Sequence, residues 1–456
     1  MTATASPTGL TGRTLFPGDA GFEEEKATFN LCVEHTPYVI VRAQNRLDVQ
    51  AAVRYAAGAG RAVAVQATGH GIGAEADGAV LISTKAMREV QIRPEARVAR
   101  FEAGARWAEV VAAAAEHGLA PLVGSTPFVS AVGYHCGGGL PIFGRKYGFA
   151  ADHVRAFDLV TADGALRHVD PGTEPDLFWA VRGGKSNFGV VVSMEVELFP
   201  ITTVYGGKLV FPGGMSDRVF PAWRDWTATL PEAMATAAMW IRFPDIPQLP
   251  EEIRGQYIFH VTIGYDGDAA EGARLVEPLR ALSPIVDTVQ ELPYTRNGEI
   301  YDDPVDPGFY VEASGLLDSM DDETVKRVLE AVGPGAENPP FAVNIRLLGG
   351  ALARTPELPS AVSHRGGSHL MMVLNLAPDA TLVPPLTEHA RAVLATMGPA
   401  LTGGVLPNWL GTAMTAPEEV AQAYSPADWD RLRAVKRAVD PGNMFRINHN
   451  IPPAGV

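Results

Sequence analysis

The sequence has little cysteine and no long apolar run, and each shortage excludes a class of protein. Two cysteines, Cys32 and Cys136, are too few for a disulfide framework, and neither has the paired spacing of a structural zinc site. No apolar run reaches the roughly 18 residues that a membrane span needs, and the start of the chain lacks a basic segment followed by an apolar one. We therefore expect no membrane partner and, by default, a cytoplasmic location.

Positive charge is scarce too. The chain has 37 Lys and Arg against 52 Asp and Glu, which gives a formal net charge of -15. This excess opposes the phosphate backbone of nucleic acids, so we expect no nucleic-acid partner. The hydrophobic content of 46% and the charged content of 20% are those of an ordinary globular protein. A chain of 456 residues predicts roughly two to four structural units and leaves the oligomeric state open.

The first half of the chain alternates strands and helices. Residues 38–43 (YVIVRA) and 62–67 (AVAVQA) are apolar runs that predict strands, and the amphipathic segment between them predicts a helix with Asn45 as its N-cap. A strand and a helix follow again over residues 97–118. A hairpin is expected over residues 154–169, with its turn at Asp163-Gly164.

The pattern changes near residue 200. Strands with alternating apolar positions recur in TTVYGGKLVF, MWIRF, YIFHVTIGY, AVNIRLLG and HLMMVLNL, and helical segments separate some of them. This pattern predicts a mainly antiparallel sheet backed by helices. Near the C-terminus, SPADWDRLRAVKRAV predicts a helix that ends at Asp440-Pro441-Gly442.

Two glycine-rich loops invite a nucleotide hypothesis, yet neither matches a standard nucleotide motif. After Gly71 and Gly73, the third glycine position of the Rossmann fingerprint holds Ala76, and in the second loop it holds Ile142. A near miss to the P-loop has Arg145 where the lysine belongs. The two loops remain able to converge on one diphosphate through their backbone N–H groups. Plain turns are the alternative.

Four segments carry a more specific signal: PYVIVRAQNRLDVQAAVRYAAGAGRAVAVQATGHGIG, AVGYHCGGGLPIFGRKYGFAADHV, DLFWAVRGGKSNFGVVVSMEVELFP and DRLRAVKRAVDPGNMFRINHNIPP. In this order and spacing they resemble the signature segments of berberine bridge enzyme-like, FAD-linked oxidases of the vanillyl-alcohol oxidase and p-cresol methylhydroxylase superfamily. The resemblance covers residues 36–200 and 405–456. It implies an α+β fold, with a two-subdomain FAD-binding domain of the p-cresol methylhydroxylase type and a substrate domain whose antiparallel sheet is backed by helices.

The same resemblance implies a division of the chain. We expect an N-terminal arm over residues 1–35, an FAD-binding domain over 36–200, a substrate-binding domain over 201–404, and a C-terminal segment over 405–456 that returns to the FAD domain.

The resemblance also assigns a role to His70, which lies between two glycines in TGHG. In the family the corresponding histidine is bonded through its ring to the 8α carbon of FAD. A neutral imidazole is a usable nucleophile near pH 7, and the flanking glycines let the ring system of the cofactor approach closely. The alternative is a turn histidine that faces water.

Some relatives have a second covalent link, made by a cysteine. Thr126 takes that cysteine's place here, and a hydroxyl cannot form the thioether. Cys136 lies ten residues later, directly before the triple glycine, and is expected to be a small buried packing residue. The sequence therefore predicts one covalent bond to FAD and not two.

Other residues are expected to hold FAD by their position in these segments. The second glycine-rich loop resembles one that holds the flavin, and the alternative is that it is only a structural turn. The strand at Val190 is expected to bind the cofactor through its main chain. The full set of expected FAD contacts is Thr68, Gly69, His70, Gly71, Ile72, Gly73, Thr126, Val132, Gly133, Gly137, Gly138, Gly139, Tyr147, Gly148, Val190, Asn448 and Asn450.

For catalysis, the resemblance points to Tyr424 as the base, because relatives frequently have a tyrosine at this distance before an Arg-Leu pair. Free tyrosine has a pKa of about 10, so it would need a cationic or hydrogen-bonding neighbour to act near neutrality. Ser425 and Pro426 follow it, where relatives differ, and a packing role is the alternative. His449 is the second candidate base, or a hydrogen-bonding spacer.

Asn344, Arg346 and Asn375 are expected to contact substrate, although strand periodicity alone does not tell which face they occupy. The function implied is an FAD-dependent oxidase. It would remove a hydride from an alcohol or amine carbon of a small secondary-metabolite or sugar-like substrate and pass the electrons to O2, giving H2O2. A dehydrogenase with another electron acceptor and a catalytically idle flavin-binding protein are the alternatives.

Overall fold

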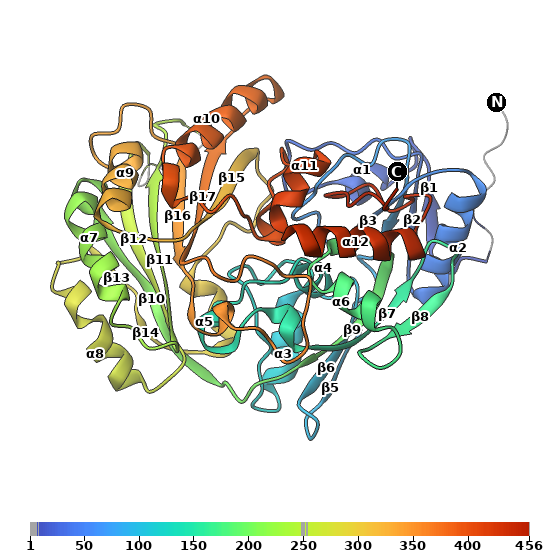
Figure 1. Cartoon of the computed structure of the whole chain (residues 1–456), viewed down its shortest axis with the longest axis horizontal. Coiled ribbons are helices and arrows are strands. Elements are labelled where there is room, and N and C mark those ends of the chain that lie inside the picture. Colours follow the sequence, from blue (N-terminus) through green and yellow to red (C-terminus); the bar gives the residue numbers. More distant parts are fainter. Residues whose placement is uncertain (1–6, 8, 248–250, 252–253, 456) are drawn as a thin grey trace.

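The computed structural model describes residue 7, residues 9–247, residue 251 and residues 254–455, and its strands form three sheets (Figure 1). In the first sheet the strand order is β1-β2-β4-β3, with β2 and β3 parallel to the β4 strand between them. The elements of this part are β1 (Arg13–Leu15), α1 (Phe22–Lys26), β2 (Val39–Arg42), α2 (Arg46–Gly58), β3 (Val63–Gln66) and β4 (Val80–Ser83).

Helix α2 begins as the sequence predicts. The side chain of Asn45 accepts hydrogen bonds from the backbone N–H groups of Leu47 and Asp48, which have no partner within the helix. The described part of the expected N-terminal arm is built into this sheet, because β1 pairs with β2 and because Leu15 and Phe22 are buried.

The second sheet follows in the chain and has the strand order β5-β6-β9-β7-β8, with all of its pairs antiparallel. The predicted strand and helix over residues 97–118 are β6 and α3, and the predicted hairpin is formed by β7 and β8. Its elements are β5 (Val90–Arg93), β6 (Val98–Glu102), α3 (Trp107–Ala115), α4 (Ala131–Cys136), α5 (Gly144–Tyr147), β7 (Val154–Val160), β8 (Leu166–Val169), α6 (Pro175–Val181) and β9 (Val190–Glu197).

The third sheet is antiparallel and has eight strands, as the alternating pattern after residue 200 predicts in kind. Helices α7 to α10 lie on one face of it, at the left of Figure 1. Its elements are β10 (Thr203–Pro212), α7 (Ser216–Thr227), β11 (Met234–Arg242), β12 (Tyr257–Tyr265), α8 (Ala269–Arg280), β13 (Val286–Asp287), β14 (Gln290–Pro293), β15 (Tyr310–Leu317), α9 (Asp322–Val332), β16 (Ala342–Leu347), β17 (His369–Leu376) and α10 (Val383–Ala395).

Side-chain alternation gives this sheet two distinct faces. On β16, Val343 and Ile345 pack into the core beneath the helices, together with Trp223 of α7 and Trp240 of β11. Successive strand residues point to opposite faces, so Asn344 and its second neighbour on β16 point away from the helices.

The C-terminal segment returns to the first two sheets. Helices α11 (Pro417–Val420) and α12 (Pro426–Val439) lie on that side of the molecule, at the right of Figure 1. A buried ion pair of 2.8 Å joins Lys436, in the last turn of α12, to Asp440, the residue at which the sequence predicts the helix to end.

The architecture confirms the expected α+β fold class. Strand β15 and helices α7 and α10 are elements that the sequence did not predict. Within the described ranges, no helix is both long and apolar enough to cross a bilayer.

Candidate active site

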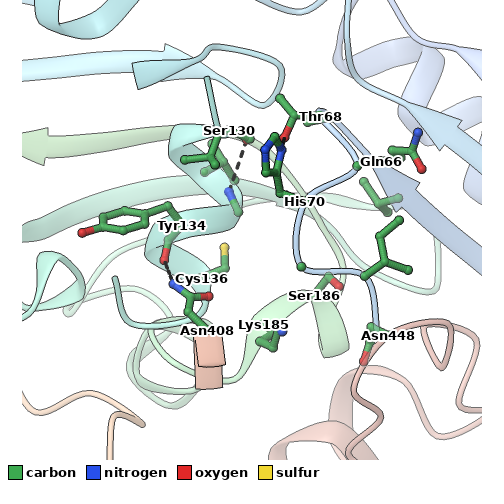
Figure 2. Close-up of a pocket in the computed structure, with 18 of the residues that line it drawn as sticks. Gln66, Thr68, His70, Ser130, Tyr134, Cys136, Lys185, Ser186, Asn408 and Asn448 are labelled. Atoms are coloured by element: carbon green, nitrogen blue, oxygen red, sulfur yellow. Dashed lines mark hydrogen bonds between the residues drawn. The ribbon is translucent and has the colours of Figure 1, made fainter. Parts of the chain in front are cut away.

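A cavity of about 350 Å³ is lined by residues from the regions of all three sheets and from the C-terminal segment (Figure 2). The glycine-rich loop after β3 forms one wall, and helix α4 and the start of β9 form the next. Arg346 of β16 comes from the third sheet, and Trp409 and Asn448 come from the C-terminal segment. The cavity therefore gathers the segments on which the sequence placed cofactor and substrate.

The glycines of the first loop differ in what a side chain at each position would contact. Gly69 has a φ of 75°, and a Cβ there would lie 2.9 Å from the backbone of Thr28 and Phe29. A Cβ at Gly73 would lie 2.4 Å from the backbone nitrogen of His449, so this glycine lets the loop pack against the C-terminal segment. Gly71 has a φ of 62° and no heavy atom within 4 Å of a Cβ built on it. The loop is thus anchored on both sides and open at its centre.

His70 lies on this open part of the loop. Its Nδ1 is 3.0 Å from the hydroxyl of Thr68, and its ring stacks on that of Phe29 with 3.9 Å between centroids. Its Nε2 is buried and has no hydrogen-bond partner among the described residues. Burial, aided by the positive charge of Arg106, lowers the pKa of His70 to about 4. The imidazole is therefore neutral at pH 7.

The second glycine cluster packs against protein. A Cβ at Gly137 would lie 1.7 Å from the side-chain oxygen of Asn408, and one at Gly139 would lie 2.6 Å from the ring of Tyr134. Gly138 has a φ of 94° and lies against Val362. None of the three lines the cavity, which favours the structural-turn alternative.

Both Thr126, which takes the place of the second linking cysteine of some relatives, and Cys136 lie at the cavity. Thr126 lines the cavity, and its hydroxyl donates a hydrogen bond of 2.7 Å to Asp303. Cys136 is 6% exposed and also lines the cavity. Burial raises the pKa of the Cys136 thiol to about 12, so the thiol is protonated and inert at neutral pH.

Lys185 is a cation that contacts the C-terminal segment. It lines the cavity, and its Nζ lies 2.8 Å from Nδ1 of His449 and 3.3 Å from the carbonyl oxygen of Pro407. Burial lowers the pKa of Lys185 to about 8, although the carboxylate of Glu312 on β15 opposes this. Burial also lowers the pKa of His449 well below its usual value, so this imidazole is neutral.

The two predicted catalytic residues are placed differently. Tyr424 is 4% exposed, does not line the cavity, and donates a hydrogen bond of 3.0 Å to the carbonyl oxygen of Gly183. Burial raises its pKa further above the ordinary tyrosine value. This placement favours the packing alternative for Tyr424. His449 lies directly behind Lys185 and does not itself line the cavity.

The three predicted substrate residues divide between the two faces of the third sheet. Arg346 lines the cavity, and Asn344 accepts a hydrogen bond of 3.0 Å from its Nε. Asn375 donates to the carbonyl oxygen of Leu386 in α10, so it lies on the helix-covered face of β17. The prediction for Asn375 is corrected for this reason, since a strand residue on that face does not reach the cavity.

Most of the predicted FAD contacts come together. Of the predicted residues, the cavity is lined by Thr68, Gly69, His70, Gly71, Ile72, Gly73, Thr126, Val132, Gly133, Val190, Asn448 and Arg346. Tyr147 and Gly148 lie elsewhere: the Tyr147 hydroxyl donates to Asp266, and Gly148 packs beside Asp152. The side-chain oxygen of Asn450 is buried without a partner, but this residue does not line the cavity.

Sequence reasoning missed Lys185, Tyr134, Asn408 and Trp409 as cavity residues. Only Lys185 left a signal, because it interrupts the glycine-rich stretch RGGKSNFG. Its backbone has a φ of 58°, the left-handed region that glycine adopts most easily.

Comparison with protein families agrees with this geometry. Residues 37–170 match the model of an FAD binding domain, and residues 411–452 match the model described as berberine and berberine like. The chain is an FAD-linked oxidoreductase that is similar to berberine bridge enzyme-like proteins. The FAD domain model ends after β8, and the berberine-like model contains α12 and the segment with Asn448. The two matched regions therefore contribute to the same cavity.

Relatives of this FAD-linked oxidoreductase match nearly its whole length. (R)-6-hydroxynicotine oxidase of Paenarthrobacter nicotinovorans is 29% identical and covers 99% of both chains. Xylooligosaccharide oxidase of Thermothelomyces thermophilus is 26% identical over 95% of this chain and 91% of the relative.

Solved structures share the fold. 6-Hydroxy-D-nicotine oxidase from Arthrobacter nicotinovorans superposes with a TM-score of 0.83 at 25% identity, covering 98% of this chain and 99% of the other. Berberine bridge enzyme-like 1 of Physcomitrella patens has a TM-score of 0.82 at 19% identity and covers 97% of each chain. The oxidoreductase thus shares its fold with these proteins over nearly its whole length.

Proposed function

We propose that this protein is an FAD-dependent oxidase. It removes a hydride from an alcohol or amine carbon of a small organic substrate and passes the electrons to O2, giving H2O2. The observation that carries the proposal is His70, whose neutral ring has a buried, unpartnered nitrogen on an open glycine loop. Relatives named as oxidases of a hydroxynicotine and of xylooligosaccharides support the same reaction type.

The residues of the cavity fit FAD. The backbone at Gly71 leaves room for close approach of a ligand, and His70 Nε2 and Asn448 Oδ1 are buried polar atoms that have no partner among the described residues. In this arrangement the loop from Thr68 to Gly73, the start of α4 and Val190 hold the cofactor. The FAD portion then comprises residues 36–200 with 405–456, and it closes against a substrate portion of residues 201–404. When bound, FAD supplies the acceptor for the hydride.

His70 is the residue that would hold FAD covalently. A pKa of about 4 keeps its imidazole unprotonated at pH 7, and the stacked ring of Phe29 with the Thr68 hydroxyl fixes its orientation. Thr126 takes the place of the second linking residue of some relatives, and its hydroxyl is no substitute for a thiolate. Cys136 is protonated and inert. One covalent bond, through His70, is therefore proposed.

The proton of the substrate needs a base at the cavity wall. Lys185 lines the cavity, and the pKa of about 8 of its amine leaves an appreciable fraction of the neutral form near pH 7. His449 Nδ1, 2.8 Å away, accepts a hydrogen bond from that amine and orients it. We assign the proton transfer to Lys185, with His449 as its positioning residue. Tyr424, whose hydroxyl is engaged with Gly183, remains the competing assignment.

Acid precipitation tests the cofactor and its bond. The yellow colour should stay with the precipitated wild-type protein, whereas His70→Ala should release FAD into the supernatant. Colourless purified protein that takes up no FAD would refute the proposal.

Stopped-flow kinetics then test the reaction. After anaerobic bleaching by an alcohol or amine, recovery of the yellow form in air within milliseconds to seconds supports the oxidase. A bleached form that persists for minutes indicates a dehydrogenase with another acceptor. A flavin that no member of an alcohol and amine panel bleaches indicates a catalytically idle flavin-binding protein.

A further inference from the structure

The guanidinium of Arg346 is held in a fixed position at the cavity wall. It lies 4.4 Å from the ring centroid of Tyr301 and 4.8 Å from that of Trp409. Its Nε donates a hydrogen bond of 3.0 Å to the side-chain oxygen of Asn344. A planar cation that contacts two aromatic rings and donates a hydrogen bond is favourably placed, and its remaining freedom is small.

The terminal nitrogens of this guanidinium have no hydrogen-bond partner within the part of the chain that the structure describes. Among the described residues, no carboxylate forms an ion pair with Arg346, and only its Nε is hydrogen-bonded. The described residues that line the cavity include no aspartate or glutamate. Lys185 differs in this respect, because its amine already donates to Pro407 and His449. Arg346 is thus a fixed cation that has no anionic partner among the described residues.

A second donor near Arg346 is also unsatisfied. Tyr134 lines the same cavity, and its hydroxyl is buried and has no hydrogen-bond partner among the described residues. Burial raises the pKa of Tyr134, and the positive charge of Arg346 opposes this rise. An acceptor near Arg346 could therefore pair with the terminal N–H groups of Arg346 and also with the buried Tyr134 hydroxyl, which is costly to leave unpaired.

A carboxylate is the anion that matches this site. The two terminal N–H groups of an arginine form a planar fork that binds both oxygens of a carboxylate in parallel. The diphosphate of FAD is the other anion to consider. Arg346 comes from β16 of the third sheet, whereas the open glycine backbone that suits a diphosphate is in the loop after β3. Arg346 thus lies on the wall that the second half of the chain contributes.

We propose that Arg346 binds a carboxylate of the substrate, so that the preferred substrates are alcohols or amines that also carry a carboxylate. The reaction in this inference rests on the proposed oxidase function, whereas the binding of a carboxylate does not. It narrows the substrate class from small organic alcohols and amines to hydroxy acids and amino acids in the wide chemical sense, including uronic and aromatic acids. Asn344 acts as a positioning residue for the guanidinium.

A binding measurement tests the inference without turnover. Oxidised holoprotein is titrated with benzoate and with benzamide, which have the same shape but differ in charge, and binding is followed by the change in flavin absorbance. We expect benzoate to bind at least tenfold more tightly than benzamide. Arg346→Gln should abolish this difference, and Arg346→Lys should keep only part of it. Arg274→Gln, an exposed arginine on α8, is the matched control and should bind benzoate as the wild type does.

A kinetic measurement connects the site to the reaction. The kcat/KM of the wild type for 4-(hydroxymethyl)benzoate should exceed that for 4-(hydroxymethyl)benzamide at least tenfold, and Arg346→Gln should lose this preference. Equal binding of benzoate and benzamide by the wild type would overturn the inference, whether or not the variants fold. Purification of Arg346→Gln without FAD would overturn it differently, by assigning Arg346 to the diphosphate. If no alcohol or amine bleaches the flavin, the oxidase proposal fails, while the benzoate titration still decides the carboxylate site.

Discussion

The amine of Lys185 lies 2.8 Å from Nδ1 of His449, and the two residues are separated by more than half of the chain. One belongs to a short 3-10 turn, Lys185–Asn187, that precedes β9, and the other to the berberine-like C-terminal segment. Asn187 joins the same two segments, because its side chain donates to the carbonyl oxygen of His449 and accepts from the N–H of Ile451. The C-terminal segment therefore completes the cavity wall and also orients Lys185, the residue that we propose as the base.

The first prediction concerns the pH dependence of the reaction. Because the pKa of Lys185 is lowered to about 8, the neutral amine that acts as a base becomes more abundant as pH rises through that value. We expect kcat/KM to rise with pH and to level off above about 8. Lys185→Met should remove this rise and lower kcat by about 10²- to 10⁴-fold, the usual contribution of a positioned base. A pH series of steady-state rates checks this.

Two further variants separate the base from the charge. Lys185→Arg keeps a cation that does not deprotonate in this range, so it should be as inactive as Lys185→Met. Lys326→Met, on the exposed surface of α9, should leave the pH profile unchanged. Glu312 and His449 face Lys185 as well, and burial raises the pKa of Glu312 to about 7. A profile that keeps its rise in Lys185→Met would therefore move the assignment to Glu312.

The second prediction concerns Tyr424. Its hydroxyl donates to a buried carbonyl oxygen, so Tyr424→Phe should lower the free energy of unfolding by about 1–2 kcal/mol and leave kcat within a factor of two or three. Tyr294→Phe is the matched control, since that buried hydroxyl also donates to a backbone carbonyl, of Pro121. Denaturant unfolding and steady-state rates check both. A hundredfold loss of kcat in Tyr424→Phe alone would restore Tyr424 as the base.

Local sequence patterns predicted much of the fold because they act over short distances. The cap at Asn45, the hairpin turn at Gly164 and the end of α12 at Asp440 follow from side-chain and backbone preferences within a few residues. Strand β15 was missed because YVEASGLL lacks a regular apolar alternation. Its place in the third sheet is set by pairing with β17, which is a long-range relationship.

The site was predicted less completely, and the reason is again distance. The first glycine loop could be predicted because the residues of its motif, Thr68 to Gly73, are consecutive in the sequence. Whether a strand residue faces the cavity depends on register, and Asn375 falls on the helix side although Arg346 does not. Likewise, Gly137 of the triple glycine packs against Asn408, whose position depends on how the C-terminal segment packs. Such contacts require the folded chain.

The third prediction concerns the Cys136 thiol. With a pKa of about 12 it is protonated at any ordinary pH, so native protein treated with iodoacetamide at pH 8 should remain unmodified at this residue. Peptide mass analysis checks this, and denatured protein, in which the thiol regains its ordinary pKa, is the positive control. Cys136→Ala should retain one covalently bound FAD per chain. Loss of the flavin from this variant would show that the cysteine takes part in attachment.

The last prediction concerns the anchor of the C-terminal segment. Lys436 is 0% and Asp440 1% exposed, and the lysine also donates to the carbonyl oxygens of Asn187 and Phe445. Asp440 in turn accepts from the N–H groups of Met444 and Phe445. Removing one partner of such a buried pair leaves an uncompensated charge, which costs about 3–5 kcal/mol. Lys436→Met should therefore destabilise the protein by this amount in chemical unfolding, and it should loosen the segment that carries Asn448 and His449.

The double variant Lys436→Met with Asp440→Asn should recover part of the loss, because no unpaired carboxylate remains. If the segment is held by this pair, flavin fluorescence, which is quenched in a tight site, should rise in Lys436→Met and fall again in the double variant. An unchanged unfolding free energy in Lys436→Met would mean that hydrophobic packing of α12 alone holds the segment against the cavity.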